Sequence, residues 1–409
     1  MKGIKKIALV LIITLSFQAK AQDTLSILSY NILNYPFSNS SKADTLKPII
    51  KYSQPDIFMI TELTSGAGAT TILNDALNVD GITYYQQAQY VNGPDTDNLL
   101  YYNADKLVLH SQHEISTALR NISEYVLYYK SPNLSPISDT IFINCYVAHL
   151  KASSGSTNEQ KRNQEAVALK NYLDTKAATV ENIFLGGDFN LYSNLEPAHN
   201  TILNGGNVLL FDPISSPGAW NNNSTFAAIH TQSTRSGSLG DGGAFGGMDD
   251  RFDWIFTSND VLTGTNNISY ITNTYTALGN DGAHFNKSIN ASPTNTAVPA
   301  NIANALYYMS DHLPVFMQVE VDITVGINEQ VNSNNWKGYL ANNQFYFNAN
   351  QTTKKLTVVV YDLLGKTRLK QPYQNKQKLT LSLNKLQQGI YFVTVFSEST
   401  QKSFKVFKR

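Results

Sequence analysis

The 409-residue sequence contains a single cysteine, Cys145, and only 15% of its residues are charged. One cysteine cannot form an internal disulfide, so the fold must depend on the burial of apolar side chains. Because Cys145 lies inside an apolar run, we expect it to be a small buried side chain. The hydrophobic fraction of 42% is typical of a globular protein, and the length allows about two or three domains with a large core.

Long hydrophobic runs are also lacking. The sequence opens with lysines, followed by an apolar run from Ile7 to Phe17 and a small-x-small motif at residues 19–21. That order predicts a secretory signal peptide over residues 1–21. A transmembrane anchor is the alternative, but it needs about 20 apolar residues, roughly twice what this run supplies. No later segment is long enough, so the sequence predicts an exported protein with no stable membrane span.

The net charge of zero hides a division of the chain into two parts. Residues 326–409 have 13 Lys and Arg against 3 Asp and Glu, a balance of +10. Residues 22–325 have 14 against 28, a balance of −14, and four lysines before them complete the total. The acidic part is a poor general binder of phosphate backbones, because such binding depends on Lys and Arg that displace counterions.

The acidic part alternates short apolar runs with amphipathic segments, which predicts sheets covered by helices. Helical periodicity is clearest over 159–176, where Ala166, Leu169 and Leu173 share one side, and it also appears at 46–52 and 69–77. Strands are predicted at 25–32, 56–63, 98–103, 141–150, 182–189, 251–258 and 314–321.

Two stretches of the acidic part follow neither pattern. Residues 233–247 are rich in glycine, and residues 290–304 are rich in Asn, Ala and Thr. Both are predicted to be mobile surface segments. A glycine-rich phosphate cradle is disfavoured for the first, because it lacks the strand-loop-helix context and the lysine of such a cradle.

Residues 331–409 are predicted to be a small all-β sandwich domain after a linker at 324–330. Its strands are expected within 356–369, 379–383, 389–397 and 402–409, and it has no acid-base constellation. The phrases VVVYDLLGK, LQQGIYFVTV and KSFKVFKR resemble the C-terminal sorting domain of the type IX secretion system. This resemblance implies contact with the secretion machinery and export across an outer membrane, followed by removal of the domain or attachment at the cell surface. A β-sandwich that serves as a binding appendage is the alternative.

Polar side chains suited to acid-base chemistry stand at the ends of the predicted strands in residues 22–323. In GGDFN, Asp188 and Asn190 alternate with an apolar residue and so face the same way. In SDHLP, Asp311 and His312 come directly before a strand. Ligand sites gather at such edges, although most of these residues taken singly are better explained as caps, turn formers or satisfied core groups. The other members of the set are Asn31, Glu62, His149 and Asp253.

The phrases SYNILNY, ITEL, VAHLK, GGDFN, RFDWIF and SDHLP, in this order, resemble the endonuclease/exonuclease/phosphatase superfamily. That group includes deoxyribonuclease I, abasic-site endonucleases, neutral sphingomyelinases and inositol phosphatases. The phrases cover almost the whole of residues 25–321. The resemblance implies a four-layer α/β sandwich, in which two packed mixed β-sheets are flanked by helices, for a catalytic domain at 22–323.

The resemblance also implies a metal site. Glu62 would be the principal ligand of Mg²⁺, helped by Asn31 and Asp311, since a hard cation prefers carboxylate and carbonyl oxygens. Oxygen ligands select hardness and not one ion, so Mn²⁺ or Ca²⁺ could replace Mg²⁺. Zinc is disfavoured, because its sites need clustered His and Cys.

Catalytic roles follow from the same resemblance. Asp188 would orient or deprotonate the attacking water, and Asn190 would hold a phosphate oxygen. His312, oriented by Asp253 through its second ring nitrogen, would act as an acid-base group or as a proton donor. His149 would donate to a non-bridging oxygen in the transition state. Asp97 or Asn98 would orient the ring of this last histidine.

The leading functional hypothesis is a secreted, monomeric, metal-dependent nuclease acting on extracellular nucleic acid, with Arg251 and Lys151 as predicted substrate contacts. The acidic balance argues against it, and a divalent ion and saline surroundings would partly offset that charge. One alternative is a phospholipid phosphodiesterase of the sphingomyelinase type, or a phosphatase. A non-catalytic surface binding protein is a second alternative, which the complete residue set disfavours. Further candidates for phosphate contact or base stacking are Arg120, Arg162, Tyr30, Tyr35 and Trp220.

Overall fold

The computed structural model describes residues 22–36, 42–130, 140–323, 336–363, 365–397 and 401–408. The predicted signal peptide and the predicted linker lie outside these residues. Contacts divide the chain into two compact units, Met1–Thr324 and Val325–Arg409, called here the N-terminal and C-terminal units. Among the described residues, no helix has both the length and the apolar character needed to cross a membrane.

Two mixed sheets form the centre of the N-terminal unit. Sheet A has the strand order β11-β13-β1-β2-β4-β3, with β12 also paired to β13, and sheet B has the order β5-β6-β7-β8-β10-β9. Sheet A consists of β1 (Gln22–Tyr35), β2 (Ile57–Leu63), β3 (Tyr85–Gln87), β4 (Asp97–Asn103), β11 (Ile268–Tyr270), β12 (Thr276–Ala277) and β13 (Val315–Asp322). Sheet B consists of β5 (Leu107–Ile115), β6 (Ile122–Tyr129), β7 (Phe142–His149), β8 (Ile183–Asp188), β9 (Leu210–Phe211) and β10 (Asp253–Ser258).

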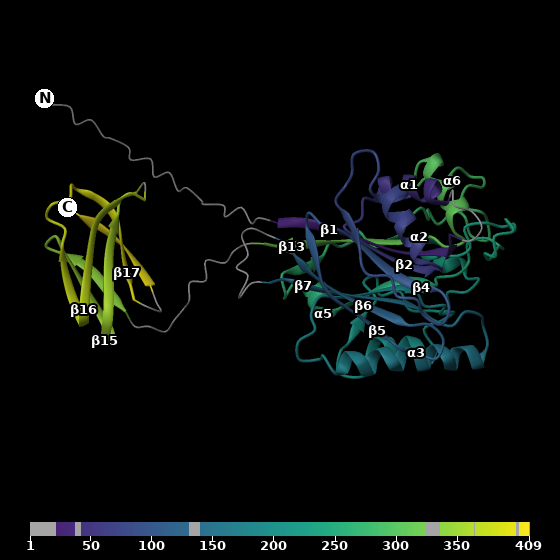
Figure 1. The fold of residues 1–409 in the computed structure, drawn as a ribbon, viewed down its shortest axis with the longest axis horizontal. Coiled ribbons are helices and arrows are strands. Elements are labelled where there is room, and N and C mark those ends of the chain that lie inside the picture. The colour runs from purple at the N-terminus through teal and green to yellow at the C-terminus, as the bar shows by residue number, and fades with distance from the viewer. Residues whose placement is uncertain are drawn as a thin grey trace, which may run out of the picture. The chain divides into compact units, whose positions relative to one another are not determined.

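Helices cover the outer faces of the two sheets. In Figure 1, α1 (Lys42–Ser53), α2 (Gly66–Thr71) and α6 (Ala300–Met309) lie on one side, and α3 (Ser156–Asp174) lies on the opposite side. A π-helical turn, η1 (Ile72–Leu77), continues α2, while α4 (Pro197–Asn204) packs on α3. The remaining helices are α5 (Asn259–Thr263) and the 3-10 helix η2 (Ser224–Ile229). The four layers confirm the predicted α/β sandwich.

The inner faces of the two sheets pack directly against each other. Met59 of sheet A and Cys145 of sheet B belong to one continuous buried cluster, and Cys145 is a free, buried thiol as expected. Gly186 lets the sheets approach closely, since a Cβ there would come 2.5 Å from Cε of Met59. Gly187 has a φ of 143°, and a Cβ there would collide with the Ala148 carbonyl oxygen. Both glycines of the GGDFN phrase are therefore required by packing at the strand end that carries Asp188.

The structure contains all seven strands predicted in this unit, and helices at all three predicted positions. The short strands β3, β9, β11 and β12 were not predicted. β5 and β6 were also missed, because their apolar residues are mixed with polar ones such as His113 and Glu124. The prediction for residues 233–247, called here the glycine loop, is wrong at its beginning. Ser233, Thr234 and Arg235 are buried and not on the surface. The segment at 290–304 contains the start of α6.

The C-terminal unit is entirely antiparallel. It consists of β14 (Lys337–Ala341), β15 (Gln344–Tyr361), β16 (Thr367–Ser382), β17 (Gly389–Phe396) and β18 (Gln401–Lys408). The long β15 pairs with β16 along one side, and with β14 and then β17 along the other. Phe345 and Leu381 from one half of this ribbon share a core with Val358 and Val393 from the other half. The separate all-β domain predicted from the sequence is thus present.

Candidate active site

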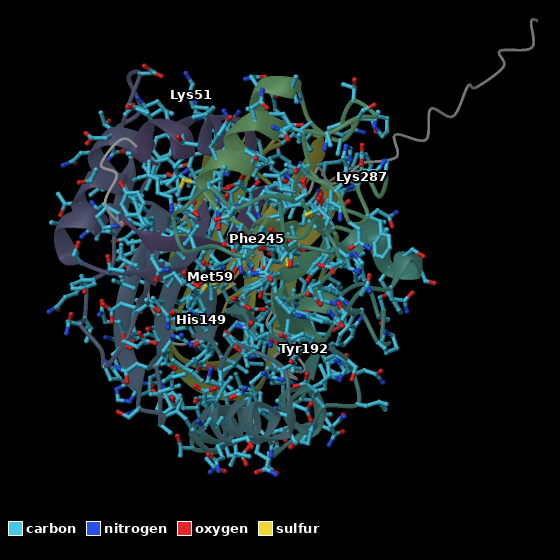
Figure 2. The ribbon with its side chains drawn as sticks, turned by 90° about the vertical axis from the view of Figure 1, so that its right-hand side faces the viewer. Lys51, Met59, His149, Tyr192, Phe245 and Lys287 are labelled. Atoms are coloured by element: carbon cyan, nitrogen blue, oxygen red, sulfur yellow. The ribbon has the colours of Figure 1, made fainter. Side chains whose placement is uncertain are left out.

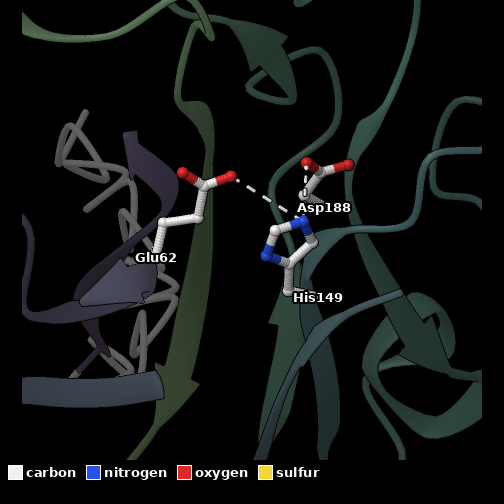
Figure 3. A group of neighbouring side chains, drawn as sticks. All are labelled: Glu62, His149 and Asp188. Atoms are coloured by element: carbon white, nitrogen blue, oxygen red, sulfur yellow. Dashed lines mark ion pairs between the residues drawn. The ribbon is translucent and has the colours of Figure 1, made fainter. Parts of the chain in front are cut away.

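Sheet B places three functional side chains together by strand register alone. β7 and β8 run parallel, and His149 lies opposite Asp188 in their pairing. β10 runs antiparallel to β8, so its first residue, Asp253, also lies opposite Asp188. Nε2 of His149 is 3.5 Å from Oδ2 of Asp188 (Figure 3). These residues were predicted from separate phrases of the sequence, and the sheet brings them to one edge.

Sheet A contributes Glu62 through an irregularity in its backbone. The pairing of β2 with both neighbouring strands shifts around this residue, and its φ is 63°, which is uncommon for a residue other than glycine. A bulge of this kind re-aims a side chain at the edge of a sheet. Nε2 of His149 lies 3.8 Å from Oε1 of Glu62, and Figure 3 shows an oxygen of this carboxylate directed toward His149 and Asp188.

Asn31, at the same end of β1, links the two sheets. Its Nδ2 donates to Oε1 of Glu62 at 2.9 Å and to Oδ2 of Asp188 at 3.0 Å. Its Oδ1 accepts from the backbone N–H of Leu33 at 3.0 Å. The predicted role of Asn31 as an oxygen ligand is not what this orientation provides, because the amino group and not the oxygen faces the carboxylates. Asn31 instead holds two carboxylates in place.

Asp311 and His312 reach the same edge because β13 runs antiparallel to β1. The hydroxyl of Ser310 donates to the carbonyl of Asn31 at 2.7 Å, which fixes the start of β13 against the end of β1. Nδ1 of His312 lies 2.7 Å from Oδ2 of Asp253, and its Nε2 lies 3.6 Å from Oδ2 of Asp188. His312 is therefore oriented by Asp253 and directed toward Asp188, the arrangement predicted for this pair.

Gln232 is a site residue that the sequence did not indicate. Its Nε2 lies 2.6 Å from Nε2 of His312 and donates to Oδ2 of Asp311 at 3.3 Å. The same Asp311 oxygen accepts from the backbone N–H of Ala244, in the glycine loop, at 2.7 Å. A glutamine in an irregular segment and a backbone amide have no recognisable pattern in a single sequence, so no signal could have found them.

Burial and mutual repulsion determine the protonation of the carboxylates. Burial raises the pKa of Asp188 to about 7, although His312 counteracts this, and it also raises the pKa of Glu62, with a further increase from the charge of Asp311. Four carboxyl groups, those of Glu62, Asp188, Asp253 and Asp311, therefore share a small region in which water cannot screen their charges.

The two imidazoles are shifted in opposite directions. Burial lowers the pKa of His312, but the carboxylates of Asp253, Asp188 and Asp311 together outweigh it and raise this pKa well above its usual value. Burial lowers the pKa of His149 well below its usual value, and the nearby charge of Arg120 lowers it further. His149 is therefore a neutral imidazole at physiological pH, which can donate a hydrogen bond but carries no positive charge.

The carboxylates and imidazoles fit a divalent cation. Ligand atoms of Glu62, His149 and Asp188 all lie within 4.8 Å of one another, and the same holds for Asp188, Asp253 and His312. Among the described residues, Oδ1 of Asp311 is buried with no hydrogen-bond partner. A buried carboxylate oxygen without a partner is costly, and a hard cation is the group that carboxylates at this spacing accept best. The metal identity predicted from the sequence, Mg²⁺ with Mn²⁺ or Ca²⁺ as alternatives, stays a prediction.

Comparison with known families decides the broad chemistry. Residues 28–312, more than two thirds of the chain, match the model of the Endonuclease/Exonuclease/phosphatase family. The chain belongs to this family. As a member of the endonuclease/exonuclease/phosphatase family it is a hydrolase acting on phosphate esters. The resemblance recognised from its six sequence phrases is thereby confirmed.

Solved structures with this fold are similar to the chain at low identity. A D. rerio TDP2 complexed with single-strand DNA product is 13% identical, covers 72% of this chain and 98% of its own, and has a TM-score of 0.47. The catalytic domain of human Nocturnin with bound sulfate is 15% identical, with 73% and 97% covered and a TM-score of 0.45. The 3′ phosphatase NExo from Neisseria, bound to a product DNA hairpin, is 13% identical, with 72% and 98% covered and a TM-score of 0.42. A search of curated proteins found no match.

The C-terminal unit has a family of its own. Residues 341–409 match the model described as Secretion system C-terminal sorting domain. The protein is therefore exported by type IX secretion to the cell surface or the outside, as the sequence predicted.

The sequence predicted that Arg251 and Lys151 contact the substrate, but Arg251 is buried. The guanidinium of Arg251 pairs with Asp212 at 2.9 Å and lies 3.4 Å from the ring centroid of Trp254, and the side chain is 1% exposed. Arg251 therefore stabilises the core, and the predicted contact with substrate is wrong. Lys151 is only partly buried, and its charge lowers the pKa of His149. Lys151 stays a candidate for contact with a phosphate.

The other residues predicted to contact phosphate or bases are buried or paired within the protein. Arg162 is fully buried and pairs with Glu196 at 2.8 Å. Arg120 is partly buried, and its guanidinium pairs with Asp95 at 3.0 Å. The aromatic rings predicted to stack on bases are all fully buried: Tyr30, Tyr35 and Trp220. Apolar bulk favoured burial for these rings, and sequence alone does not distinguish a buried aromatic ring from one at a surface.

Two predicted positions differ from the structure in detail. Nδ2 of Asn190 donates to the carbonyl of Leu150 at 3.2 Å, and its backbone N–H donates to Oδ1 of Asp188 at 3.0 Å, so this residue fixes the turn after β8. Nδ1 of His149 has no partner among the described residues. Asp97 accepts from Gly93, while Asn98 donates through Nδ2 to Val147 and its Oδ1 has no partner among the described residues. Orientation of His149 by Asn98 therefore stays a prediction.

Proposed function

We propose that the protein is a secreted, metal-dependent phosphodiesterase that hydrolyses extracellular nucleic acid. The observation that carries the proposal is the convergence of Glu62 and Asp188 with two imidazoles at one edge of both sheets, where Gln232 also joins Asp311 to His312. A structural ion-pair network does not need this many buried carboxylates so close together, since each one raises the cost of the next. Such an arrangement is suited to binding a cation and a phosphate together.

Glu62 and Asp311 are the proposed metal ligands. Asp311 presents an oxygen with no hydrogen-bond partner among the described residues. Burial raises the pKa of Glu62, and the negative charge of Asp311 raises it further, which places the two carboxylates within electrostatic reach of each other. A bound divalent cation would polarise the phosphoryl group and offset the negative charge that develops during attack. His149 is less suited as a ligand, because its Nε2 lies against two carboxylate oxygens and can donate its proton to a substrate oxygen nearby.

Asp188 is the proposed base for the attacking water. Its Oδ1 accepts from the backbone of Asn190, and its Oδ2 accepts from Asn31, so the carboxylate has a fixed orientation. Burial raises its pKa toward neutrality, which makes it a better proton acceptor than an exposed aspartate. His312, whose ring is held by Asp253, is placed to exchange a proton with Asp188 or with the leaving group.

A phospholipid phosphodiesterase is the second candidate, and the glycine loop provides the observation in its favour. This loop exposes two large apolar side chains, Leu239 and Phe245, with 40% and 61% of their surface accessible. Phe245 follows Ala244, whose N–H binds Asp311, and Figure 2 shows it in the middle of this face of the unit. Apolar residues at the rim of the site are what an enzyme acting at a lipid surface would use.

A panel of esters tests the proposal. The chain from residue 22 onward is given single-stranded and double-stranded DNA, RNA, sphingomyelin vesicles, bis-p-nitrophenyl phosphate and p-nitrophenyl phosphate, each with Mg²⁺, Mn²⁺ or EDTA. We expect cleavage of nucleic acid that is lost with EDTA and in His312→Asn. His110→Asn is the matched control, because His110 is an exposed histidine on β5.

Each other result has a defined meaning. Cleavage of sphingomyelin without cleavage of nucleic acid would establish the second candidate. Hydrolysis of the monoester alone would indicate a phosphatase. Binding of any of these substrates with no hydrolysis under any metal would show that the proposed function is wrong.

A further inference from the structure

We propose that the glycine loop (residues 233–247) positions Asp311 and thereby sets the affinity of the site for its divalent cation. The proposal rests on the proposed function, in which Asp311 is a metal ligand. Residues that hydrogen-bond to a metal ligand and orient it commonly change the metal affinity by about 10- to 100-fold when they are mutated. Here those residues come from a segment outside the six phrases that carry the family resemblance.

The loop binds Asp311 at its side chain and at its backbone. The N–H of Ala244 donates to Oδ2 of Asp311 at 2.7 Å, while Oδ1 of the same carboxylate has no partner among the described residues. The N–H of Thr234 donates to the Asp311 carbonyl at 3.0 Å, and the Thr234 hydroxyl donates to the carbonyl of Ser310 at 2.6 Å. One oxygen is therefore held by the loop, and the other has no hydrogen-bond partner among the described residues. A carboxylate held in this way is oriented by the loop and keeps an oxygen for a cation.

The two ends of the loop are fastened to each other. The carbonyl of Arg235 accepts from the N–H groups of Gly246 and Gly247 at 3.1 and 3.0 Å. The hydroxyl of Ser233 donates to the carbonyl of Ala244 at 2.9 Å, so Ala244 is held to the start of the loop through its carbonyl and to Asp311 through its N–H. Because these bonds close the loop on itself, the Ala244 amide cannot shift without breaking them.

A buried ion pair fills the inside of the loop. The guanidinium of Arg235 is fully buried, and its Nη1 lies 2.7 Å from Oδ2 of Asp241. Nε and Nη2 of this arginine have no hydrogen-bond partner among the described residues. A buried guanidinium that has one carboxylate partner depends on that partner, so the pair fixes the position of the loop's middle.

Gly243 is the point where the loop, the arginine and the ligand meet. A Cβ at this position would come 2.2 Å from Nη2 of Arg235, 2.8 Å from Cδ2 of Leu33 and 3.1 Å from Cγ of Asp311. Its φ is outside the left-handed region, so a substitution would act through these contacts and not through backbone strain. All three contacted side chains are buried, so none has free space beside it. An added methyl group must therefore displace the arginine of the ion pair, Leu33 or the ligand itself.

Gly243→Ala and Gly237→Ala form a matched pair for the test. Gly237 lies in the same loop, also outside the left-handed region, and a Cβ there would meet nothing within 4 Å. The Mn²⁺ dissociation constant of each full-length variant is measured by isothermal titration calorimetry and by electron paramagnetic resonance of free Mn²⁺. We expect Gly243→Ala to weaken Mn²⁺ binding by on the order of tenfold, and Gly237→Ala to leave it unchanged. Raising Mn²⁺ should restore the kcat of Gly243→Ala on bis-p-nitrophenyl phosphate.

Asp241→Asn is the second variant, and it serves if Gly243→Ala does not fold. It keeps the shape of the side chain and removes the charge that pairs with Arg235, so we expect weaker Mn²⁺ binding with a folded chain, as judged by thermal melting. Folded variants that bind Mn²⁺ as tightly as Gly237→Ala would overturn the role of the loop while the proposed function stands. A wild-type chain that neither binds Mn²⁺ nor hydrolyses any ester would overturn both.

Discussion

The two halves of the site are built in different ways. On sheet B, His149, Asp188 and Asp253 are neighbours because the strands pair in register, and regular hydrogen bonding is sufficient to place them. On sheet A, Glu62 is directed into the site by a bulge, and Asp311 is held by a loop that comes from elsewhere in the chain. Regular structure thus places the proposed base, Asp188, with His149 and Asp253, while irregular structure places the proposed metal ligands and His312, which follows Asp311.

This difference indicates how each half can fail. A register between strands is shared by many hydrogen bonds, so a single side-chain change on sheet B should remove chemistry and leave the geometry intact. A bulge or a loop depends on a few contacts, so a change on sheet A should alter the affinity for the cation. The following predictions separate the two kinds of loss.

Asp188→Asn should have the largest effect. The isosteric amide cannot accept the proton of water, so we expect kcat on bis-p-nitrophenyl phosphate to fall by roughly 10²- to 10⁴-fold. Saturating Mn²⁺ should not restore the rate, and the Mn²⁺ dissociation constant should change far less than kcat. Asp105→Asn, at an exposed turn, is the control. Recovery of the rate with added metal would place Asp188 among the ligands and would remove the contrast between the sheets.

Glu62→Gln should reverse this pattern. Loss of one charged ligand should weaken Mn²⁺ binding by on the order of 10- to 100-fold, as measured by calorimetry, and part of the rate should return at high metal concentration. Glu159→Gln is the control, because Glu159 lies in the first turn of the outer helix α3 and is not part of the candidate site. An unchanged dissociation constant with a lost kcat would mean that Glu62 belongs with the chemistry of sheet B.

Phe245→Ser should affect only large substrates. The exposed ring would contact a base or an acyl chain beside the scissile bond, and one base stacked on an aromatic ring contributes about 1–3 kcal/mol. We expect KM for the polymer or lipid to rise about tenfold, and KM for bis-p-nitrophenyl phosphate to stay constant. Tyr52→Ser, an exposed aromatic at the end of α1, is the control. An equal change for both substrates would indicate that the loop itself had moved.

Lys170→Met should leave both halves of the site unchanged and alter the pH dependence of stability. Burial lowers the pKa of Lys170 from 10.5 to about 8, and its ammonium donates to the carbonyls of Ile202 and Val208. Because the folded pKa lies below the unfolded one, unfolding takes up a proton between these values, so wild-type stability rises with pH across that window.

The size of this effect is modest and its direction is specific. Relative to Lys170→Met, the free energy of unfolding of the wild type should rise by up to about 3 kcal/mol between pH 8 and 10.5. Urea unfolding of both chains at several pH values measures it. If the two free energies of unfolding differ by the same amount at every pH, the ammonium is better solvated than its burial suggests. The Mn²⁺ affinity should be equal in both chains.

Sequence patterns were sufficient for the strand cores and for most of the residues that converge at the candidate site. Polar residues at the ends of apolar runs, such as Asp188 and His312, are visible because a buried strand is apolar until it reaches the edge of its sheet. The same logic fails for the cations. Arg251 also stands at one end of an apolar run, just before β10. Its guanidinium is nevertheless paired with Asp212 on a different segment, and no local pattern predicts that pairing.

Taken alone, the sequence determined the two-part organisation, the apolar strand cores and most of the residues that converge, because charge balance and hydrophobic periodicity are local properties. The two packed mixed sheets followed from the family resemblance, since strands such as β1 and β13 pair across almost the whole unit. Only the tertiary structure decided which atoms face each other. The amide of Ala244 and the carboxylate of Asp311 are 67 residues apart in the chain, and Gln232 is 80 residues from His312. Contacts of this kind arise when separate elements pack together, so their partners are set by the fold and not by the neighbouring sequence.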